Sequence, residues 1–169
     1  MSTTERVNEN LAQLTAAGVS VWLDQIRRSL IEGGELHRMV EEESLRGVTS
    51  NPSIFEKAIL GSNDYDDELE AMAREELSAQ EIYDRIAVRD VQLAADVLRP
   101  VWEGSGHQDG FVSLEVAADL AHDSKRTIAA AREYWKDVSR PNVMIKIPGT
   151  PEGEQAIEQA IYEGINVNV

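Results

Sequence analysis

Hydrophobic residues follow two different spacings along this chain, and the two spacings alternate. Short apolar runs rich in β-branched residues predict strands, which lie at residues 19–24, at the start of 47–53, and at 111–116, 142–147 and 165–169. The longer segments between them place apolar residues three or four positions apart, as an amphipathic helix does. Strands that alternate with helices favour a parallel sheet, because parallel neighbours need a crossover connection.

The helical segments carry signals for where they begin. An oxygen-bearing side chain followed directly by Pro, or by Glu three residues later, is typical of a first helical turn. Such signals lie at Asn51–Pro52, Ser53–Glu56, Ser78–Glu81 and Thr150–Pro151. The first two are alternative starts for the same helix. An earlier helix is predicted to end before Gly18, with Leu11 and Leu14 on its apolar face.

Polar residues recur near the carboxyl ends of the predicted strands. They are Asp24 in the first, Thr49 and Asn51 after the second, Glu115 in the third, Lys146 in the fourth, and Asn166 and Asn168 in the fifth. In parallel α/β folds the carboxyl ends of the strands form the functional rim. The sequence therefore predicts one shared site, built from side chains that lie far apart along the chain.

Lys146 is the least expected of these residues, since it interrupts an apolar strand. Period-two alternation places Val143, Ile145 and Ile147 on one face and Met144 with Lys146 on the other. If that second face lines a closed site, the amine is poorly hydrated, and its neutral form is a nucleophile that forms a Schiff base with a carbonyl. The alternative is a lysine on an edge strand that protects the sheet from aggregation.

Two carboxylates accompany this lysine, and each has a simpler explanation to set against a catalytic one. Asp24 could cap a helix that begins at Gln25. Glu115 lies between Leu114 and Val116 in an apolar strand, where capping cannot explain it. Because an unpaired buried carboxylate is costly, Glu115 requires either a site or a partner cation.

Composition narrows the classes of function. The formal charge of −15 and the lack of any Lys or Arg run argue against nucleic-acid binding. There is no Cys, so disulfides and thiolate chemistry are excluded. No apolar run approaches the ~20 residues that span a bilayer, and the opening residues are too polar for a signal peptide. A cytoplasmic protein without a membrane partner is expected.

Five motifs make the chain resemble the N-terminal part of a transaldolase, and together they extend over nearly all of it. They are VSVWLDQIRRSLI, RGVTSNPSIFEKAI, FVSLEVAADLAHDSKRTI, NVMIKIPGTPEG and GINVNV. The resemblance implies a class I aldolase-like (β/α)₈ barrel of the TIM type, with no metal and no organic cofactor. It also implies transfer of a dihydroxyacetone unit from sedoheptulose 7-phosphate to glyceraldehyde 3-phosphate, in the pentose phosphate pathway.

The same resemblance assigns roles to the residues at the strand ends. Lys146 matches the lysine that forms the Schiff base. Asp24 matches the acid/base at the C4 hydroxyl, and Glu115 the residue that acts through a water during imine formation and hydrolysis. Asn51 and Asn168 match side chains that hold the bound dihydroxyacetone, and Thr49 is a further candidate for substrate binding. Ser50 stands where many members have Thr.

The resemblance also sets expectations about completeness. Val169 lies in or at the end of the fifth strand, so the chain is expected to be a single barrel domain, 1–169, truncated after about five strands. The family's phosphate-binding residues are then expected beyond residue 169, and the isolated chain is expected to be inactive and to associate or be poorly soluble. A non-catalytic half-barrel that associates or binds sugar phosphate, or another Schiff-base aldolase, remains an alternative, and the oligomeric state is open.

Overall fold

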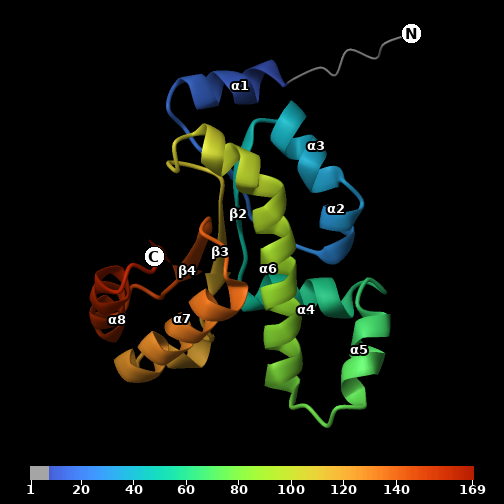
Figure 1. Ribbon diagram of the computed structural model, residues 1–169, viewed down its shortest axis with the longest axis vertical. Helices are drawn as coiled ribbons and strands as arrows, with labels where there is room; N and C mark the ends of the chain where they lie inside the picture. Colours follow the sequence, from blue (N-terminus) through green and yellow to red (C-terminus); the bar gives the residue numbers. More distant parts are fainter. Residues whose placement is uncertain (1–7) are drawn as a thin grey trace.

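The computed structural model describes residues 8–169 and has an α/β fold with a parallel sheet (Figure 1). The sheet has five strands in the order β1-β2-β3-β4-β5, and every neighbouring pair is parallel. The strands are β1 (Val21–Leu23), β2 (Leu45–Thr49), β3 (Phe111–Glu115), β4 (Val143–Lys146) and β5 (Val167–Asn168). The five predicted strands and their parallel arrangement are confirmed; four have shorter bounds than predicted, and β2 begins two residues earlier.

Helices fill the connections between the strands. They are α1 (Glu9–Ala16), α2 (Arg28–Glu32), α3 (Glu35–Glu42), α4 (Pro52–Leu60), α5 (Asp66–Ala73), α6 (Ala79–Gly104), the short 3₁₀ helix η1 (Ala118–Leu120), α7 (Ser124–Val138) and α8 (Pro151–Tyr162). Figure 1 shows α6 running lengthwise along the sheet, with α2 and α3 to one side of it and α7 and α8 to the other. None of the helices in residues 8–169 is both long and apolar enough to cross a membrane.

Most of the predicted helix starts are confirmed by capping contacts. Asn51 caps α4 by accepting a hydrogen bond from the Ile54 N–H at 2.9 Å, with Pro52 as the first helical residue. The alternative start at Ser53 is therefore wrong. Ser78 and Glu81 form the expected capping box of α6, and Thr150 caps α8.

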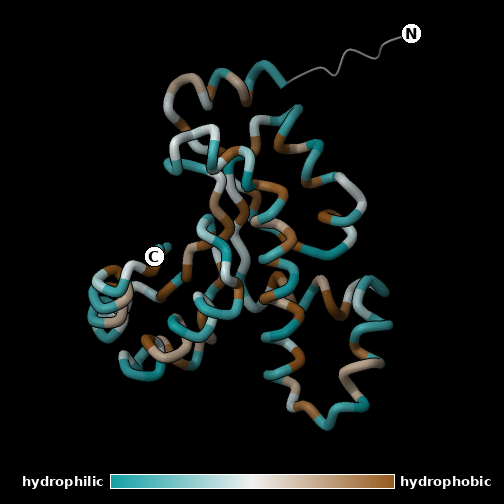
Figure 2. The backbone as a smooth tube through the Cα atoms, viewed as in Figure 1, coloured by the Kyte–Doolittle hydropathy of each residue, from teal (hydrophilic) through white to brown (hydrophobic). Residues whose placement is uncertain are grey.

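The two faces of the sheet differ in composition, as the alternation in residues 142–147 predicts. Val143, Ile145 and Ile147 are fully buried, whereas Met144 and Lys146 are half-buried. The buried face packs against α6, α7 and α8 in one hydrophobic core, which also contains Val48, Val112, Leu114, Val91, Leu98, Ala131, Val138, Ala156 and Ala160. Figure 2 shows this concentration of hydrophobic residues in the strands and along α6. The other face of the sheet carries the polar residues.

Helices α4 and α5 form an excursion between β2 and α6, at the end of the sheet where β2 finishes (Figure 1). The turn between them caps a distant helix. The Tyr65 hydroxyl accepts a hydrogen bond from the Arg28 N–H at 3.0 Å, and Asp64 Oδ2 accepts one from the Ser29 N–H at 3.1 Å. The first amides of α2 thus find acceptors more than thirty residues away in sequence.

A buried charged group fastens this excursion to α6. Asp90 is fully buried in α6, where its carboxylate accepts hydrogen bonds from the Tyr65 hydroxyl at 2.7 Å and from Arg28 Nε. Burial raises the pKa of Asp90, and the two hydrogen bonds act in the opposite direction. Arg28 also pairs with Glu68 of α5 at 2.9 Å. The position of the connection between β1 and α2 therefore depends on α5 and α6.

One prediction about the first elements is wrong, and another holds in part. The helix after β1 begins at Arg28, with Arg27 in an extended conformation at its N-cap, so Asp24 does not cap it. Helix α1 ends before Gly18 as expected, but Leu14 is 44% exposed and none of the residues of α1 is buried. Leu11, the other residue of the predicted apolar face, is half-buried, so residues 8–169 cover that face only in part.

Candidate active site

Lys146 and Glu115 meet at the carboxyl ends of two neighbouring strands. Strands β3 and β4 pair in a register that sets the two residues directly opposite each other. Lys146 Nζ lies 3.1 Å from Glu115 Oε2, and the two side chains are 28% and 19% exposed. Lys146 is thus the partner cation that Glu115 required from the sequence.

The pair lies in the interior of the sheet. Strand β4 has β3 on one side and β5 on the other, so Lys146 does not protect an edge strand, and that interpretation is wrong. Where most water is excluded, the Coulombic attraction within an ion pair is stronger than at the surface, and the lost hydration of the two charges opposes it. The contact also puts a proton acceptor within hydrogen-bond distance of the amine, as activation of a lysine nucleophile requires.

Asn168 completes the group at the end of β5. It pairs in register with Lys146, and its Nδ2 donates a hydrogen bond to the hydroxyl of Ser113 at 2.8 Å. Ser113 lies two residues before Glu115 in β3 and is fully buried. Three neighbouring strands therefore contribute an amine, a carboxylate and a carboxamide to one face.

Thr49 and Asn51 lie at the end of the adjacent strand, β2. Thr49 is in register with Ser113 and half-buried. The side-chain oxygen of Asn51 is committed to the α4 cap, so its Nδ2 is the group that it can offer to a ligand. Among the described residues that Nδ2 makes no hydrogen bond.

Asp24 lies apart from the lysine. It is exposed just beyond β1 and lines a cavity of about 260 Å³ together with Arg27, Ile54 and Lys57. Strands β1 and β4 are three strand spacings apart, about 14 Å across a flat sheet. The structure thus brings Glu115 and Asn168 to Lys146, and places Asp24 at the far side of the same rim.

Tyr83 of α6 has a buried hydroxyl group near the Lys146–Glu115 pair. Its ring packs edge-to-face against Phe55 of α4, with the ring centroids 5.8 Å apart. Burial, with smaller effects from the negative charges of Asp84 and Glu115, raises the pKa of Tyr83 to about 12. Within residues 8–169 its buried hydroxyl has no hydrogen-bond partner. The hydroxyl therefore stays protonated at neutral pH.

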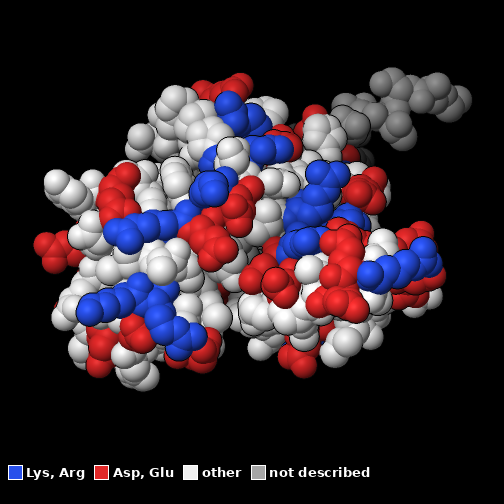
Figure 3. All heavy atoms as spheres, turned by 60° about the horizontal axis from the view of Figure 1, so that its bottom comes forward, with Lys and Arg blue, Asp and Glu red and all other residues white. Residues whose placement is uncertain are grey.

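Figure 3 looks toward this end of the molecule and shows basic side chains lying next to acidic ones. Ion pairs among the described residues, such as Arg28–Glu68, Arg126–Asp119 and Arg132–Glu163, bring charges of opposite sign together. Neighbouring charges of opposite sign offset each other's potential at a distance, and salt screens what remains beyond about 10 Å. This surface therefore offers an anionic ligand little long-range attraction.

Comparison with known proteins assigns the chain to a family. The profile of the family described as transaldolase/fructose-6-phosphate aldolase matches residues 21–169. The chain belongs to this family. The sequence resemblance to transaldolases is thereby confirmed.

Individual transaldolases show the same relationship. The chain is 47% identical over 160 residues to transaldolase 2 of Nostoc punctiforme, which covers 95% of the chain and 42% of that protein. It is 49% identical over 159 residues to the transaldolase of Thermobifida fusca, covering 94% of the chain and 43% of that protein. The transaldolase of Mycobacterium marinum is 47% identical over 162 residues, with 96% and 43% covered. The chain spans about two fifths of the length of these transaldolases.

Sequence reasoning missed Ser113 and its contact with Ser50. Both are fully buried, and the Ser50 hydroxyl donates to the Ser113 carbonyl at 2.7 Å. For Ser113 a signal existed, because alternation in β3 places it on the same face as Glu115. A small hydroxyl residue in an apolar strand has no distinctive chemistry of its own, so only its contact with Asn168 reveals it.

Proposed function

We propose that this chain carries the imine-forming part of a transaldolase site, in which Lys146 is the nucleophile. The observation that supports this most is the 3.1 Å contact of Lys146 with Glu115, beside Asn168, at the carboxyl ends of adjacent parallel strands in a chain of this family. The five-stranded sheet is then part of a (β/α)₈ barrel, whose active site belongs at this end of the strands.

The first step forms the Schiff base. The Lys146 ammonium gives one proton to the Glu115 side, and the neutral amine adds to the C2 carbonyl carbon of a ketose phosphate. After addition the nitrogen gives up a second proton; the carbonyl oxygen takes up both protons through Glu115 and a bridging water and leaves as water, and C2 becomes a protonated imine. Hydrolysis at the end of the cycle reverses these transfers.

The second step breaks and remakes a carbon–carbon bond. Asp24 takes the proton of the C4 hydroxyl, the C3–C4 electron pair moves into an enamine, and an aldose phosphate leaves. The enamine carbon then attacks the aldehyde carbon of the acceptor, and Asp24 returns its proton to the new C4 oxygen. Asn51, Asn168 and Thr49 hold the dihydroxyacetone unit while the acceptor exchanges.

The substrates in this proposal are phosphorylated sugars. Sedoheptulose 7-phosphate is the donor and glyceraldehyde 3-phosphate the acceptor, in the cytoplasmic pentose phosphate pathway, with no metal or organic cofactor. For Asp24 to reach a substrate bound at Lys146, the sheet must curve, as strands in a closed barrel do. The mixed charges at this end of residues 8–169 are why the phosphate is assigned to residues elsewhere in the barrel.

Trapping with borohydride tests the nucleophile. The chain, and in parallel any longer gene product that contains it, is incubated with dihydroxyacetone or fructose 6-phosphate, reduced and digested, and the adduct is located by mass spectrometry. The chain has four lysines, Lys57, Lys125, Lys136 and Lys146, so the site of modification is diagnostic. An adduct on Lys146 is expected; its absence from both proteins, or preference for another lysine, overturns the mechanism.

The products separate the alternatives. Transfer to glyceraldehyde 3-phosphate supports a transaldolase, whereas release of free dihydroxyacetone without transfer supports an aldolase, the other activity that the family's description includes. Sugar-phosphate binding without any adduct supports a non-catalytic protein. Asp24→Asn is expected to retain the dihydroxyacetone adduct but to slow release of glyceraldehyde 3-phosphate from fructose 6-phosphate by about 10²–10⁴-fold.

A further inference from the structure

Ser113 lies on the same face of the sheet as the proposed nucleophile, one side-chain layer before it. It pairs in register with Met144, and the next pair along the same two strands is Leu114 with Ile145, followed by Glu115 with Lys146. Its side chain is fully buried although this face of the sheet is half-open. Ser113 is thus part of the floor beneath the Lys146–Glu115 pair.

The hydroxyl of Ser113 reaches a side chain two strands away. Asn168 of β5 donates from Nδ2 to Ser113 Oγ at 2.8 Å, so the hydrogen bond passes over β4. Backbones two strands apart are separated by about 10 Å, which the two side chains must span between them. The hydrogen bond therefore holds the Asn168 side chain in an extended position across β4, the strand that carries Lys146.

The backbone of Ser113 is held as well. The Ser50 hydroxyl donates to the Ser113 carbonyl at 2.7 Å, from the residue that directly precedes the α4 cap. Ser113 thus has one contact toward β2 and one toward β5. A small residue held in this way makes a rigid anchor for the longer and more mobile side chain of Asn168.

The contact also determines which end of the carboxamide faces the site. An asparagine amide has a donor end and an acceptor end that exchange on rotation by half a turn. With Nδ2 committed to Ser113, the opposite atom, Oδ1, is the one that Asn168 presents. Oδ1 accepts hydrogen bonds and cannot donate them.

We infer that Ser113 is a positioning residue, which orients Asn168 so that it offers an acceptor to a hydroxyl or protonated-imine N–H of the bound keto sugar. This inference rests on the proposed function, because it concerns the same site. Ser113 does not touch the substrate; it acts through Asn168. The group recognised by Asn168 is accordingly a hydrogen-bond donor next to the carbon that Lys146 attacks.

A double-mutant cycle tests this inference. The rate of adduct formation on Lys146 with dihydroxyacetone and borohydride is measured for the wild type, Ser113→Ala, Asn168→Ala and the double variant, over a range of dihydroxyacetone concentrations. Ser113→Ala is expected to slow trapping at subsaturating dihydroxyacetone by about threefold to tenfold, as loss of one neutral hydrogen bond does. In the Asn168→Ala background, the same substitution is expected to have no further effect.

Two further variants separate positioning from a general structural role. Ser113→Thr keeps the hydroxyl and is expected to restore the trapping rate. Asn166→Ala is the matched control in the same segment, since the Asn166 Nδ2 donates to backbone carbonyls of Pro141 and Val143, at 3.2 and 2.9 Å, and not to the site. It is expected to change thermal stability without changing the trapping rate of the folded protein.

The outcomes distinguish failure of this inference from failure of the proposed function. Absence of an adduct on Lys146 from both the wild-type chain and a longer gene product that contains it overturns the function, and the inference with it. If the wild type forms the adduct, the positioning role alone is overturned by either of two results. In one, Ser113→Ala leaves the trapping rate unchanged; in the other, it slows trapping by the same factor with and without Asn168→Ala. A slow Ser113→Ala whose effect disappears in the Asn168→Ala background supports it.

Discussion

The two ends of strand β4 carry polar residues with opposite environments. Asn142 immediately precedes the strand and is fully buried, and its Nδ2 donates to the carbonyls of Ala95 and Gly110 at 2.8 and 2.9 Å. Lys146 ends the strand, is 28% exposed, and contacts the carboxylate of Glu115. The Asn142 side chain thus bonds to the backbone, whereas the Lys146 side chain pairs with another side chain.

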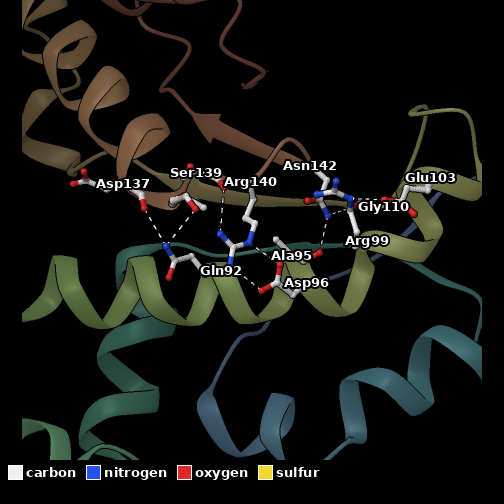
Figure 4. Close-up of polar contacts among 11 residues, drawn as sticks. Gln92, Ala95, Asp96, Arg99, Glu103, Gly110, Asp137, Ser139, Arg140 and Asn142 are labelled. Atoms are coloured by element: carbon white, nitrogen blue, oxygen red, sulfur yellow. Dashed lines mark hydrogen bonds and ion pairs between the residues drawn. The ribbon is translucent and has the colours of Figure 1, made fainter.

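The residues around Asn142 and those around Lys146 make contacts that differ in the same way. Near Asn142, Figure 4 shows Gln92 donating to the carbonyl of Asp137 at the end of α7, and Arg140 forming a bidentate pair with Asp96 of α6. These contacts join α6 to the connection between α7 and β4. Near Lys146 the contacts join side chains of β3, β4 and β5. The contacts at the amino end of β4 stabilise the fold, and its carboxyl end carries the proposed nucleophile.

The largest effect should come from Lys146→Arg. It retains a cation beside Glu115 but removes the nucleophile, because a guanidinium does not deprotonate in proteins. Complete loss of the borohydride-trapped adduct is expected, with little change in the urea midpoint. Lys136→Arg, at an exposed position of α7, is the control. A trapped adduct that persists in Lys146→Arg contradicts the proposal that the carboxyl end of β4 carries the nucleophile.

Asn142→Ala should show the reverse pattern. Two buried carbonyls lose their donors, which costs about 1–3 kcal/mol of unfolding free energy. The loss is partly offset because the Asn142 Oδ1 itself has no partner among the described residues. Urea unfolding measures the loss against Asn63→Ala at an exposed position. The adduct yield per folded molecule should stay unchanged; a fall in that yield breaks the distinction between the two ends.

Tyr65→Phe tests whether a buried polar contact outside β4 is also structural. The substitution leaves an Asp90 oxygen and the Arg28 N–H without the hydroxyl, and should lower the free energy of unfolding by about 1–3 kcal/mol. The Arg28 guanidinium, 5.4 Å from the ring centroid, keeps its aromatic contact with Phe. Tyr162→Phe, at a side chain that is 86% exposed, is the control in urea unfolding. Equal stabilities of the two variants contradict a structural role.

The smallest effect is expected at the surface, where Arg132 and Gln159 bind Glu163. The Arg132 hydrogen bonds, with a smaller contribution from Gln159, lower the pKa of Glu163 from 4.5 to about 2. A lowered folded-state pKa stabilises the fold above pH 4.5, and this stability is lost as the pH falls toward about 2. Glu163→Gln should therefore melt slightly below the wild type at pH 7.

Thermal melts between pH 7 and pH 2 measure that difference, which should vanish at the acid end and shrink in high salt. Glu158→Gln, an exposed residue of α8, is the control. A difference independent of pH contradicts the ion pair as its cause. A difference that vanishes at low pH would instead separate this contact from that of Asn142, whose carbonyl acceptors do not titrate.

Local signals predicted the elements well, because caps and strand alternation act over a few residues. Asn51, Ser78 and Thr150 all cap helices as their spacing indicates. The start of α2 was predicted wrongly for a tertiary reason: Asp64 and Tyr65 supply its acceptors from another helix connection. The residues that flank Asp24 in the sequence give no indication of that contact.

The candidate site was predicted only in part, again because some of its contacts are tertiary. Alternation put Lys146 on the polar face of its strand, and the cost of burying a carboxylate gave Glu115 a need for a cation. Neither argument could pair the two residues, because strand register depends on how the helices between them pack. Ser113 escaped notice entirely, since its importance comes from one hydrogen bond to a residue 55 positions away.

The sequence by itself determined the alternating strands and helices, the two faces of β4 and the family of the chain, all of which are local patterns of side chains. Only the tertiary structure decided that Lys146 meets Glu115, that Asn168 donates a hydrogen bond to Ser113, and that Asp24 lines a cavity instead of capping a helix. The physical reason is distance along the chain. Contacts between residues tens of positions apart exist only after the strands have aligned and the helices have packed over them.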